Sequence, residues 1–384
     1  MRQLVYCLIA GMLAFAVPVL VGGEAEAKDP RQIMGVMDGD GDGRIAKGEW
    51  KGNPRGFTKI DGDGNGYVTL EELFSFFGGG SDGGQKPAKR SASAASGDAW
   101  QGPIIDVHSQ VDEKTDLSSI VSMLDQAGIA KIMLSTRFKQ PSSDVLELAA
   151  RHPERIIPAA KTKTRAFMKG NEDYRAMFAD ELDRHDYRAI AEIIMWHAAK
   201  KKVGAGKAVI APDDPRVAMM MEASRAKGIP FIAHVEFRAM GWDKSGYLEK
   251  LEAFMGANRD VPVGMIHMGQ LDADDAARLL PKHANLFFMT SHSNPVAYEA
   301  AGQPWTRMIV DGEFAPAWKE LVLAFPDRFV LAFDNVFHFH WKDMFLPQVE
   351  VWRKTLATVP DEIAHAIAHG NAERLWGLPP AVRP

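Results

Sequence analysis

The feature that most limits the fold of this chain is a regular alternation of short apolar runs and longer amphipathic segments after residue 102. The runs are continuously apolar, which is typical of strands covered on both faces of a parallel sheet. Residues 102–384 also have a suitable length for an α/β fold of the (β/α)8 TIM barrel type, which we predict. The expected strands are Ile104–Val107, Ala130–Leu134, Arg155–Ala160, Ala189–Ile194, Phe231–Ala233, Val263–Ile266, Leu286–Met289 and Phe329–Phe333.

A doubly wound open sheet would show the same alternation. Its nucleotide-binding version is disfavoured because no Gly-x-Gly-x-x-Gly follows an early strand. The barrel is favoured by the polar residues His108, His234, His267 and Asp334, which follow the first, fifth, sixth and eighth strands. In a barrel these positions share one rim, where active sites are built.

The four rim residues have a chemistry in common. Neutral imidazoles and one carboxylate suit zinc or another divalent ion and leave room for a bound water. Asp334 could take the proton of that water as it attacks a carbonyl. Each residue alone could be a hydrogen-bonded core or loop residue, but their common position predicts a site.

Five segments of this region occur in a recognisable order: Ile105–His108, Leu124–Ile129, His152–Arg155, His267–Gly269 and Asn371–Leu378. Together they resemble the amidohydrolase superfamily, in the branch of metal-dependent TIM-barrel hydrolases and decarboxylases. The resemblance implies that His108 and His234 bind metal and that Asp334 binds metal or acts as a base. It also implies that His267 assists as an acid or base, or polarises the substrate.

One departure from the family concerns the metal. The first strand of the family normally ends His-x-His, whereas this chain has His108-Ser109-Gln110. A glutamine offers one neutral oxygen and is a poor zinc ligand beside imidazole. Either another group compensates, with Glu192 and Glu236 as candidates, or the site works without metal. Both glutamates could instead be salt-bridged or solvated.

Other polar and aromatic residues could shape the substrate pocket. Arg137 and Arg238 could bind a substrate carboxylate. The aromatic segment 337–341 resembles a pocket wall or lid, and its two histidines make a second metal site conceivable. Further candidates for the pocket are Trp196, His197, Ser291 and His292.

A small module is expected before the barrel, in residues 28–77. Two twelve-residue stretches there carry oxygen ligands at positions 1, 3 and 5, glycine at 6 and glutamate at 12, which resembles a pair of EF-hand calcium loops. We expect a small all-α module in which Ile45 and Val68 form short contacting strands and calcium has a structural role. The expected ligands are Asp38, Asp40, Asp42, the Arg44 carbonyl and Glu49, then Asp61, Asp63, Asn65, the Tyr67 carbonyl and Glu72.

Two remaining segments, residues 1–27 and 78–101, predict an export signal and a linker between the two modules. Residues 1–27 have an apolar run and an Ala-Glu-Ala ending, which predicts a cleaved signal and a periplasmic or secreted protein without a stable membrane span after cleavage. Cys7, the single cysteine, lies in this signal. Residues 78–101 are rich in Gly, Ser, Ala and Lys and predict a flexible linker. The net charge of −5 and the lack of a basic cluster disfavour nucleic-acid binding.

The sequence therefore predicts an exported, calcium-binding enzyme of the amidohydrolase type that hydrolyses an ester, lactone or amide bond of a small molecule. Calcium and a divalent metal such as zinc are the expected cofactors. A decarboxylase or lyase on the same scaffold, and a catalytically silent barrel that binds a small molecule, are the alternatives.

Overall fold

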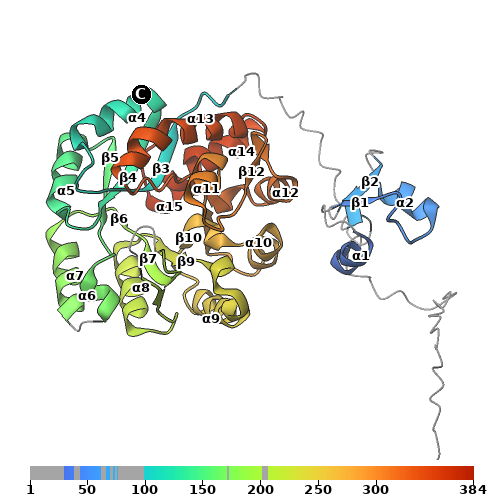
Figure 1. Ribbon diagram of the computed structural model, residues 1–384, viewed down its shortest axis with the longest axis horizontal. Helices are drawn as coiled ribbons and strands as arrows, with labels where there is room; N and C mark the ends of the chain where they lie inside the picture. Colours follow the sequence, from blue (N-terminus) through green and yellow to red (C-terminus); the bar gives the residue numbers. More distant parts are fainter. Residues whose placement is uncertain are drawn as a thin grey trace, which may run out of the picture. The chain divides into compact units, whose positions relative to one another are not determined.

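The computed structural model describes residues 30–38, 44–61, 66–69, 72–73, 76, 99–170, 173–200 and 206–384 (Figure 1). The chain divides into two compact units, residues 1–88 and 89–384, and the division falls within the segment predicted as a linker. Residues 1–27, predicted as an export signal, lie outside the described residues. Within the described part, no helix is long and apolar enough to cross a membrane.

The small unit contains helices α1 (Pro30–Met37) and α2 (Pro54–Ile60) and strands β1 (Arg44–Ala46) and β2 (Tyr67–Thr69). The helix α2 begins as its sequence predicts, because the Asn53 side chain accepts a hydrogen bond from the Arg55 N–H at 2.9 Å. The two strands pair antiparallel with Ile45 opposite Val68, and both side chains are fully buried. The unit is therefore not all-α, because residues within the two loop stretches, Arg44–Ala46 and Tyr67–Thr69, pair as a small sheet.

The predicted calcium ligands are only partly covered by the described residues. Asp40, Asp42, Asp63 and Asn65 lie outside them. The two glutamates occupy corresponding places: Glu49 accepts a hydrogen bond from the Ala46 N–H at 2.8 Å and Glu72 from the Thr69 N–H at 2.9 Å. One carboxylate oxygen of Asp61 accepts from the Gly66 N–H at 3.1 Å, and its other oxygen is buried without a hydrogen bond among the described residues.

The large unit is built around a curled parallel sheet, which confirms the predicted α/β architecture. Each strand pairs in parallel with the next along the chain, and the fourth strand is split into β6 and β7. The short strand β8 (Ala208–Val209) is antiparallel to β7. The parallel strands are β3 (Ile104–Val111), β4 (Ile129–Thr136), β5 (Ile156–Ala160), β6 (Ala189–Ile190), β7 (Ile193–His197), β9 (Phe231–Val235), β10 (Val263–Met265), β11 (Leu286–Met289) and β14 (Phe329–Val330).

The first and last strands of this sheet meet. The Val107 N–H donates to the Leu331 carbonyl at 3.2 Å, and the Asp334 N–H donates to the His108 carbonyl at 2.8 Å. The chain after β14 thus continues alongside β3, and the strand order is that of a (β/α)8 barrel. On its other side β3 pairs with β4 as far as Val111 opposite Thr136, and so the strand extends beyond Val107 to Val111. His108 and Gln110 therefore lie inside the strand instead of after it.

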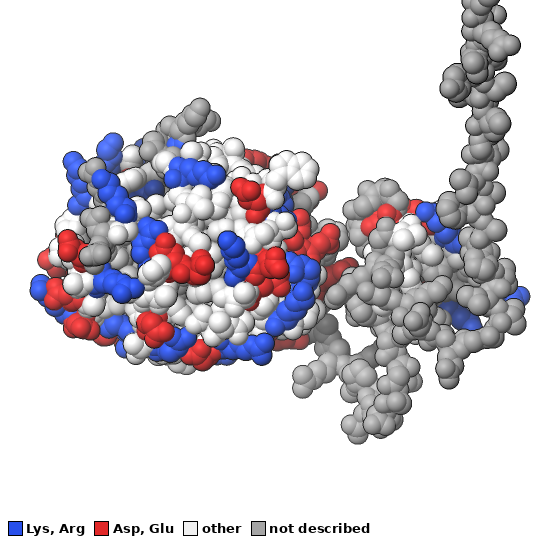
Figure 2. Space-filling model, turned by 90° about the horizontal axis from the view of Figure 1, so that it is seen from below, with Lys and Arg blue, Asp and Glu red and all other residues white. Residues whose placement is uncertain are grey.

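Helices surround the sheet, as Figure 1 shows. Their ends follow local sequence signals: α8 begins with Asp214 capping the Arg216 N–H at 2.9 Å and ends at Gly228, which adopts a left-handed φ of 64°. The helices of this unit are α4 (Ile120–Ala127), α5 (Ser142–Arg151), α6 (Arg165–Lys169), α7 (Asp173–Arg184), α8 (Pro215–Lys227), α9 (Lys244–Ala257), α10 (Ala273–Leu279), α11 (Pro295–Ala301), α12 (Pro316–Ala324), α13 (Phe345–Leu356), α14 (Asp361–His365) and α15 (Asn371–Trp376). On the face of this unit seen in Figure 2, basic and acidic side chains are interspersed.

Candidate functional site

The carboxyl-terminal ends of the parallel strands carry a cluster of buried polar side chains next to a cavity of about 610 Å³. Lys163 follows β5, and Glu192 lies between β6 and β7. The cavity is lined in part by Lys163, His234, His267, His292 and Asp334. Three residues at this end, His267, His292 and Asp334, have φ values between 54° and 60°. Such backbone is costly for residues other than glycine and gathers at functional sites.

Glu192 is the centre of the charge network in this cluster. It is fully buried, and its Oε1 accepts from Gln110 Nε2 at 2.8 Å, lies 3.5 Å from His108 Nε2 and contacts Lys163 Nζ. Its Oε2 contacts His234 Nδ1. Burial opposes ionisation, but Lys163 and His234 outweigh it and hold the pKa of Glu192 well below its usual range. This carboxylate is therefore salt-bridged and at the same time part of the site.

Asp334 presents its two oxygens to different partners. Oδ1 lies 3.3 Å from His108 Nε2, within range of an ion pair, but it is buried and has no aligned hydrogen bond among the described residues. Oδ2 lies 3.6 Å from His267 Nε2 and 3.7 Å from His292 Nδ1. Burial acts against the charged form, but His108 and His267 lower the pKa of Asp334. Asp334 is thus an ionised carboxylate whose Oδ1 can accept a further hydrogen bond or bind a cation.

His267 and His292 form a stacked pair beside Asp334. Their ring centroids are 4.6 Å apart, their Nδ1 atoms are 3.1 Å apart, and His292 also stacks on Trp305 at 4.8 Å. Ser291 Oγ lies 3.0 Å from His267 Nδ1. Burial lowers the pKa of His292 to about 4 and that of His267 well below its usual value. Both rings are therefore neutral at pH 7 and can accept a proton or donate a hydrogen bond.

His108 differs from this pair in its charge. Burial alone would lower the pKa of His108, but the nearby carboxylates of Asp334 and Glu192 raise it to about 9. The same pair of carboxylates that favours a proton on His108 would also attract a cation. Asp106 fixes this part of β3 against the last strand, because its Oδ1 accepts from the His108 and Phe333 N–H groups at 3.1 Å.

Glu236, the second candidate replacement ligand, is hydrogen-bonded to other groups and also forms a possible metal-binding set with His197 and His234. It accepts from Lys200 Nζ at 2.6 Å and from the Ala198 N–H at 2.7 Å, and lies 3.2 Å from His234 Nε2. Burial opposes its ionisation, but His234 and Lys200 lower the pKa of Glu236. His197 lines the same side of the cavity, and burial lowers its pKa to about 4.

Three basic side chains, Arg137, Lys163 and Lys200, line the cavity. The guanidinium carbon of Arg137 lies 4.6 Å from the Phe138 ring and 4.7 Å from the Phe337 ring, and its Nε is buried without a hydrogen bond among the described residues. Arg238, the other arginine proposed for a carboxylate, is exposed and does not line the cavity. It lies on the turn Phe237–Asp243, where the chain has left the strand.

The aromatic segment predicted as a wall is partly confirmed, because Phe337, Phe339 and His340 line the cavity. His338 instead lies 3.2 Å from the Asp112 carboxylate through Nδ1. The two histidines of this segment therefore do not form a shared metal site within the described residues.

A divalent metal would find suitable donor atoms in this cluster. His108 Nε2, Glu192 Oε1 and Asp334 Oδ1 lie within 4.8 Å of one another, and the unpartnered Asp334 Oδ1 is directed at this group. Glu192 also combines with His234 and His267 in a second possible set. Imidazole and carboxylate suit zinc or manganese. The additional donor would be Glu192 instead of Gln110, since the Gln110 amide nitrogen faces both His108 and Glu192.

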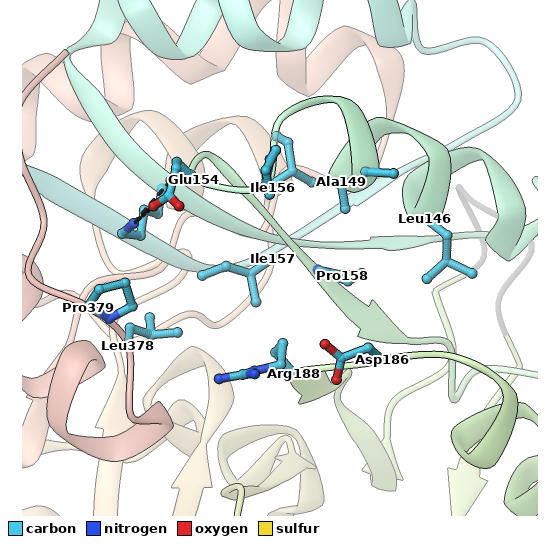
Figure 3. A pocket seen from close by; sticks show the side chains of 13 residues that line it. Leu146, Ala149, Glu154, Ile156, Ile157, Pro158, Asp186, Arg188, Leu378 and Pro379 are labelled. Carbon is cyan, nitrogen blue, oxygen red and sulfur yellow. Dashed lines mark hydrogen bonds and ion pairs between the residues drawn. The ribbon is translucent and has the colours of Figure 1, made fainter.

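A second cavity, of about 370 Å³, shares no lining residue with the first, and its lining is shown in Figure 3. Its lining combines apolar residues such as Ile157 and Leu378 with Lys131 and Glu154, which are 3.6 Å apart as an ion pair. Its lining residues include no histidine. We therefore assign the functional site to the first cavity.

No family model matches the chain, and no curated protein matches it. Among solved structures, an uncharacterized TIM-barrel protein from Bordetella bronchiseptica is similar over 72% of this chain and 99% of its own length, at 16% identity and a TM-score of 0.48. A 4-oxalomesaconate hydratase from Rhodopseudomonas palustris is similar over 72% and 96%, at 13% identity and a TM-score of 0.48. An amidohydrolase from Burkholderia multivorans with bound zinc is similar over 72% and 99%, at 12% identity and a TM-score of 0.44.

Proposed function

We propose that the large unit is an enzyme that hydrolyses an ester, lactone or amide bond of a small anionic molecule. The proposal depends chiefly on Asp334, an ionised and buried carboxylate that lines the cavity beside two neutral histidines. A carboxylate in this setting can take a proton from water as the water attacks a carbonyl. Arg137 supports an anionic substrate, because it lines the same cavity and its Nε has no hydrogen bond among the described residues. Lys163 and Lys200 also line the cavity, but they pair with Glu192 and Glu236.

The side chains around Asp334 suit the later proton transfer. Asp334 Oδ2 receives the proton of the attacking water, and it faces His267 Nε2 and His292 Nδ1. Asp334 then gives this proton to the leaving oxygen or nitrogen as its bond to the carbonyl carbon breaks. One of the neutral rings can donate a hydrogen bond to the carbonyl oxygen. His108, Glu192 and Asp334 Oδ1 would hold a divalent metal, which when bound would acidify water and polarise the carbonyl.

Metal binding by this group can be tested directly. After incubation with zinc and removal of the excess, elemental analysis is expected to find about one zinc per barrel. His108→Ala is expected to abolish most of this binding, since it removes one of three donors. His283→Ala, in which the lost ring pairs with Glu252 outside the cavity, is the matched control. Equal zinc content in both variants would contradict the assigned ligands.

A decarboxylase on the same scaffold is the second candidate. It is favoured by the apolar and aromatic part of the cavity wall, which includes Trp305, Phe337 and Met344. Such surfaces strip water from a bound carboxylate and so favour loss of CO2. Product analysis with a panel of lactones and aromatic carboxylic acids separates the two reactions. Binding without turnover of either class would instead indicate a silent barrel.

For the small unit, we propose calcium binding and export with the rest of the chain. Three observations support two calcium loops: the paired strands at Ile45 and Val68, the corresponding positions of Glu49 and Glu72, and the Asp61 oxygen that has no hydrogen bond among the described residues. The apolar run of residues 1–27 supports a periplasmic or secreted location.

Calorimetry on the full chain is expected to find two calcium ions. Glu49→Gln should lose one of them, because the last loop position provides a bidentate carboxylate that an amide cannot replace. Glu154→Gln, which changes an exposed glutamate of the large unit, should keep both. Two ions retained in Glu49→Gln would refute the first loop.

A further inference from the structure

One wall of the site cavity is formed by small residues of α11. Ala297, Ala300 and Ala301 line the cavity together with Gly302, which ends the helix. Their spacing of three and four residues places the alanines on one face of α11. Glu299 lies on the same helix but does not line the cavity. The helix therefore presents its smallest side chains to the cavity.

The position of α11 is fixed by a chain of buried amides. Asn294 caps the helix and donates through Nδ2 to Gln348 Oε1 at 3.0 Å. Gln348 donates to Asn335 Oδ1 at 3.4 Å, and Asn335 Nδ2 donates to Ser109 Oγ at 3.3 Å. All four residues are at most 1% exposed. The wall is thus tied to the residue that follows Asp334, and the space beside it is preformed.

The lining of the cavity is polar at its buried end and more apolar towards solvent. Asp334 and His267 are each 3% exposed, whereas Ala300, Gly302 and Phe339 belong to the solvent-exposed part of the lining. Phe337 and Phe339, which stack at 5.2 Å between ring centroids, add apolar surface to this outer part. At about 610 Å³ the cavity has the size of a site for a drug-sized ligand. A single aromatic ring would fill only a minor part of it.

We propose that the outer part of the cavity is an apolar subsite, and that the substrate is an amphipathic anion with a bulky apolar group beyond its reacting end. This inference rests on the proposed function and names its substrate class. The reacting group lies at Asp334, and Arg137 holds the anion. The apolar group lies against the alanine face of α11, which a larger side chain would fill.

The test compares two ligands by calorimetry on the full chain. Biphenyl-4-carboxylate is expected to bind about tenfold or more tightly than benzoate, because its second ring buries additional apolar surface. Ala301→Phe should abolish that preference and leave benzoate affinity within about twofold. Glu299→Phe adds the same side chain to the same helix away from the cavity and should keep the preference.

The subsite would be refuted if the unaltered protein bound the two ligands with equal affinity or bound neither. It would also be refuted if Ala301→Phe kept the preference for biphenyl-4-carboxylate. Because the readout is binding, the outcome is separate from that of the proposed function. If the protein shows the expected preference but no turnover, the subsite is supported and the proposed enzymatic function is refuted.

Discussion

Replacing Asp334 with asparagine is expected to lower kcat by about 10²- to 10⁴-fold, the usual contribution of a positioned general base. Asparagine keeps the shape of the side chain but cannot take a proton from water. It also removes the charge that faces His108, His267 and His292. The measurement is kcat and KM on the best substrate from the lactone and carboxylic acid panel.

Asp112→Asn is the matched control for this change. Asp112 is also a buried aspartate with a histidine partner, His338, but it does not line the cavity. We expect kcat within about threefold of the unaltered enzyme, since no reacting atom is touched. If Asp334→Asn retained full kcat in a folded protein, Asp334 would not be the base, and the hydrolytic mechanism would have to be abandoned.

The sequence predicted the strands of the sheet well because burial on both faces leaves a continuous apolar run. Leu286–Met289 was placed at its observed bounds, and the position of His108, His267 and Asp334 at one end follows from the parallel strand order. The fourth strand was less predictable. It splits after Ile190, and the interruption places Glu192 at the centre of the site.

The partners of the charged residues could not be predicted from the sequence. Lys163 gave a weak signal, a single lysine just after a strand, but its contact with Glu192 depends on how two neighbouring strands are staggered. His292 reaches His267 because both residues adopt left-handed backbone, which no sequence pattern here required. The alanine face of α11 could not be predicted either, because three alanines in a short helix resemble ordinary packing residues.

The Glu192 network explains how a buried charge cluster can be stable before any ligand binds. The Glu192 carboxylate pairs with Lys163, Gln110 and His234, so its removal would leave several buried polar groups without this partner. Gln110 bridges His108 and Glu192 in this network. A histidine there would place a further ring beside His108 instead of an amide donor.

Replacing Glu192 with alanine is therefore expected to lower the free energy of unfolding by about 3–5 kcal/mol, the usual cost of removing one partner of a buried ion pair. Urea denaturation at pH 7 measures this change. The double variant Glu192→Leu with Lys163→Met should recover a large part of the loss, because it removes the stranded ammonium as well. Glu154→Ala breaks another Lys–Glu pair, in which the Glu154 side chain is 81% exposed, and should cost less than about 1 kcal/mol. If Glu192→Ala cost no more than Glu154→Ala, the carboxylate would not be the centre of a buried network.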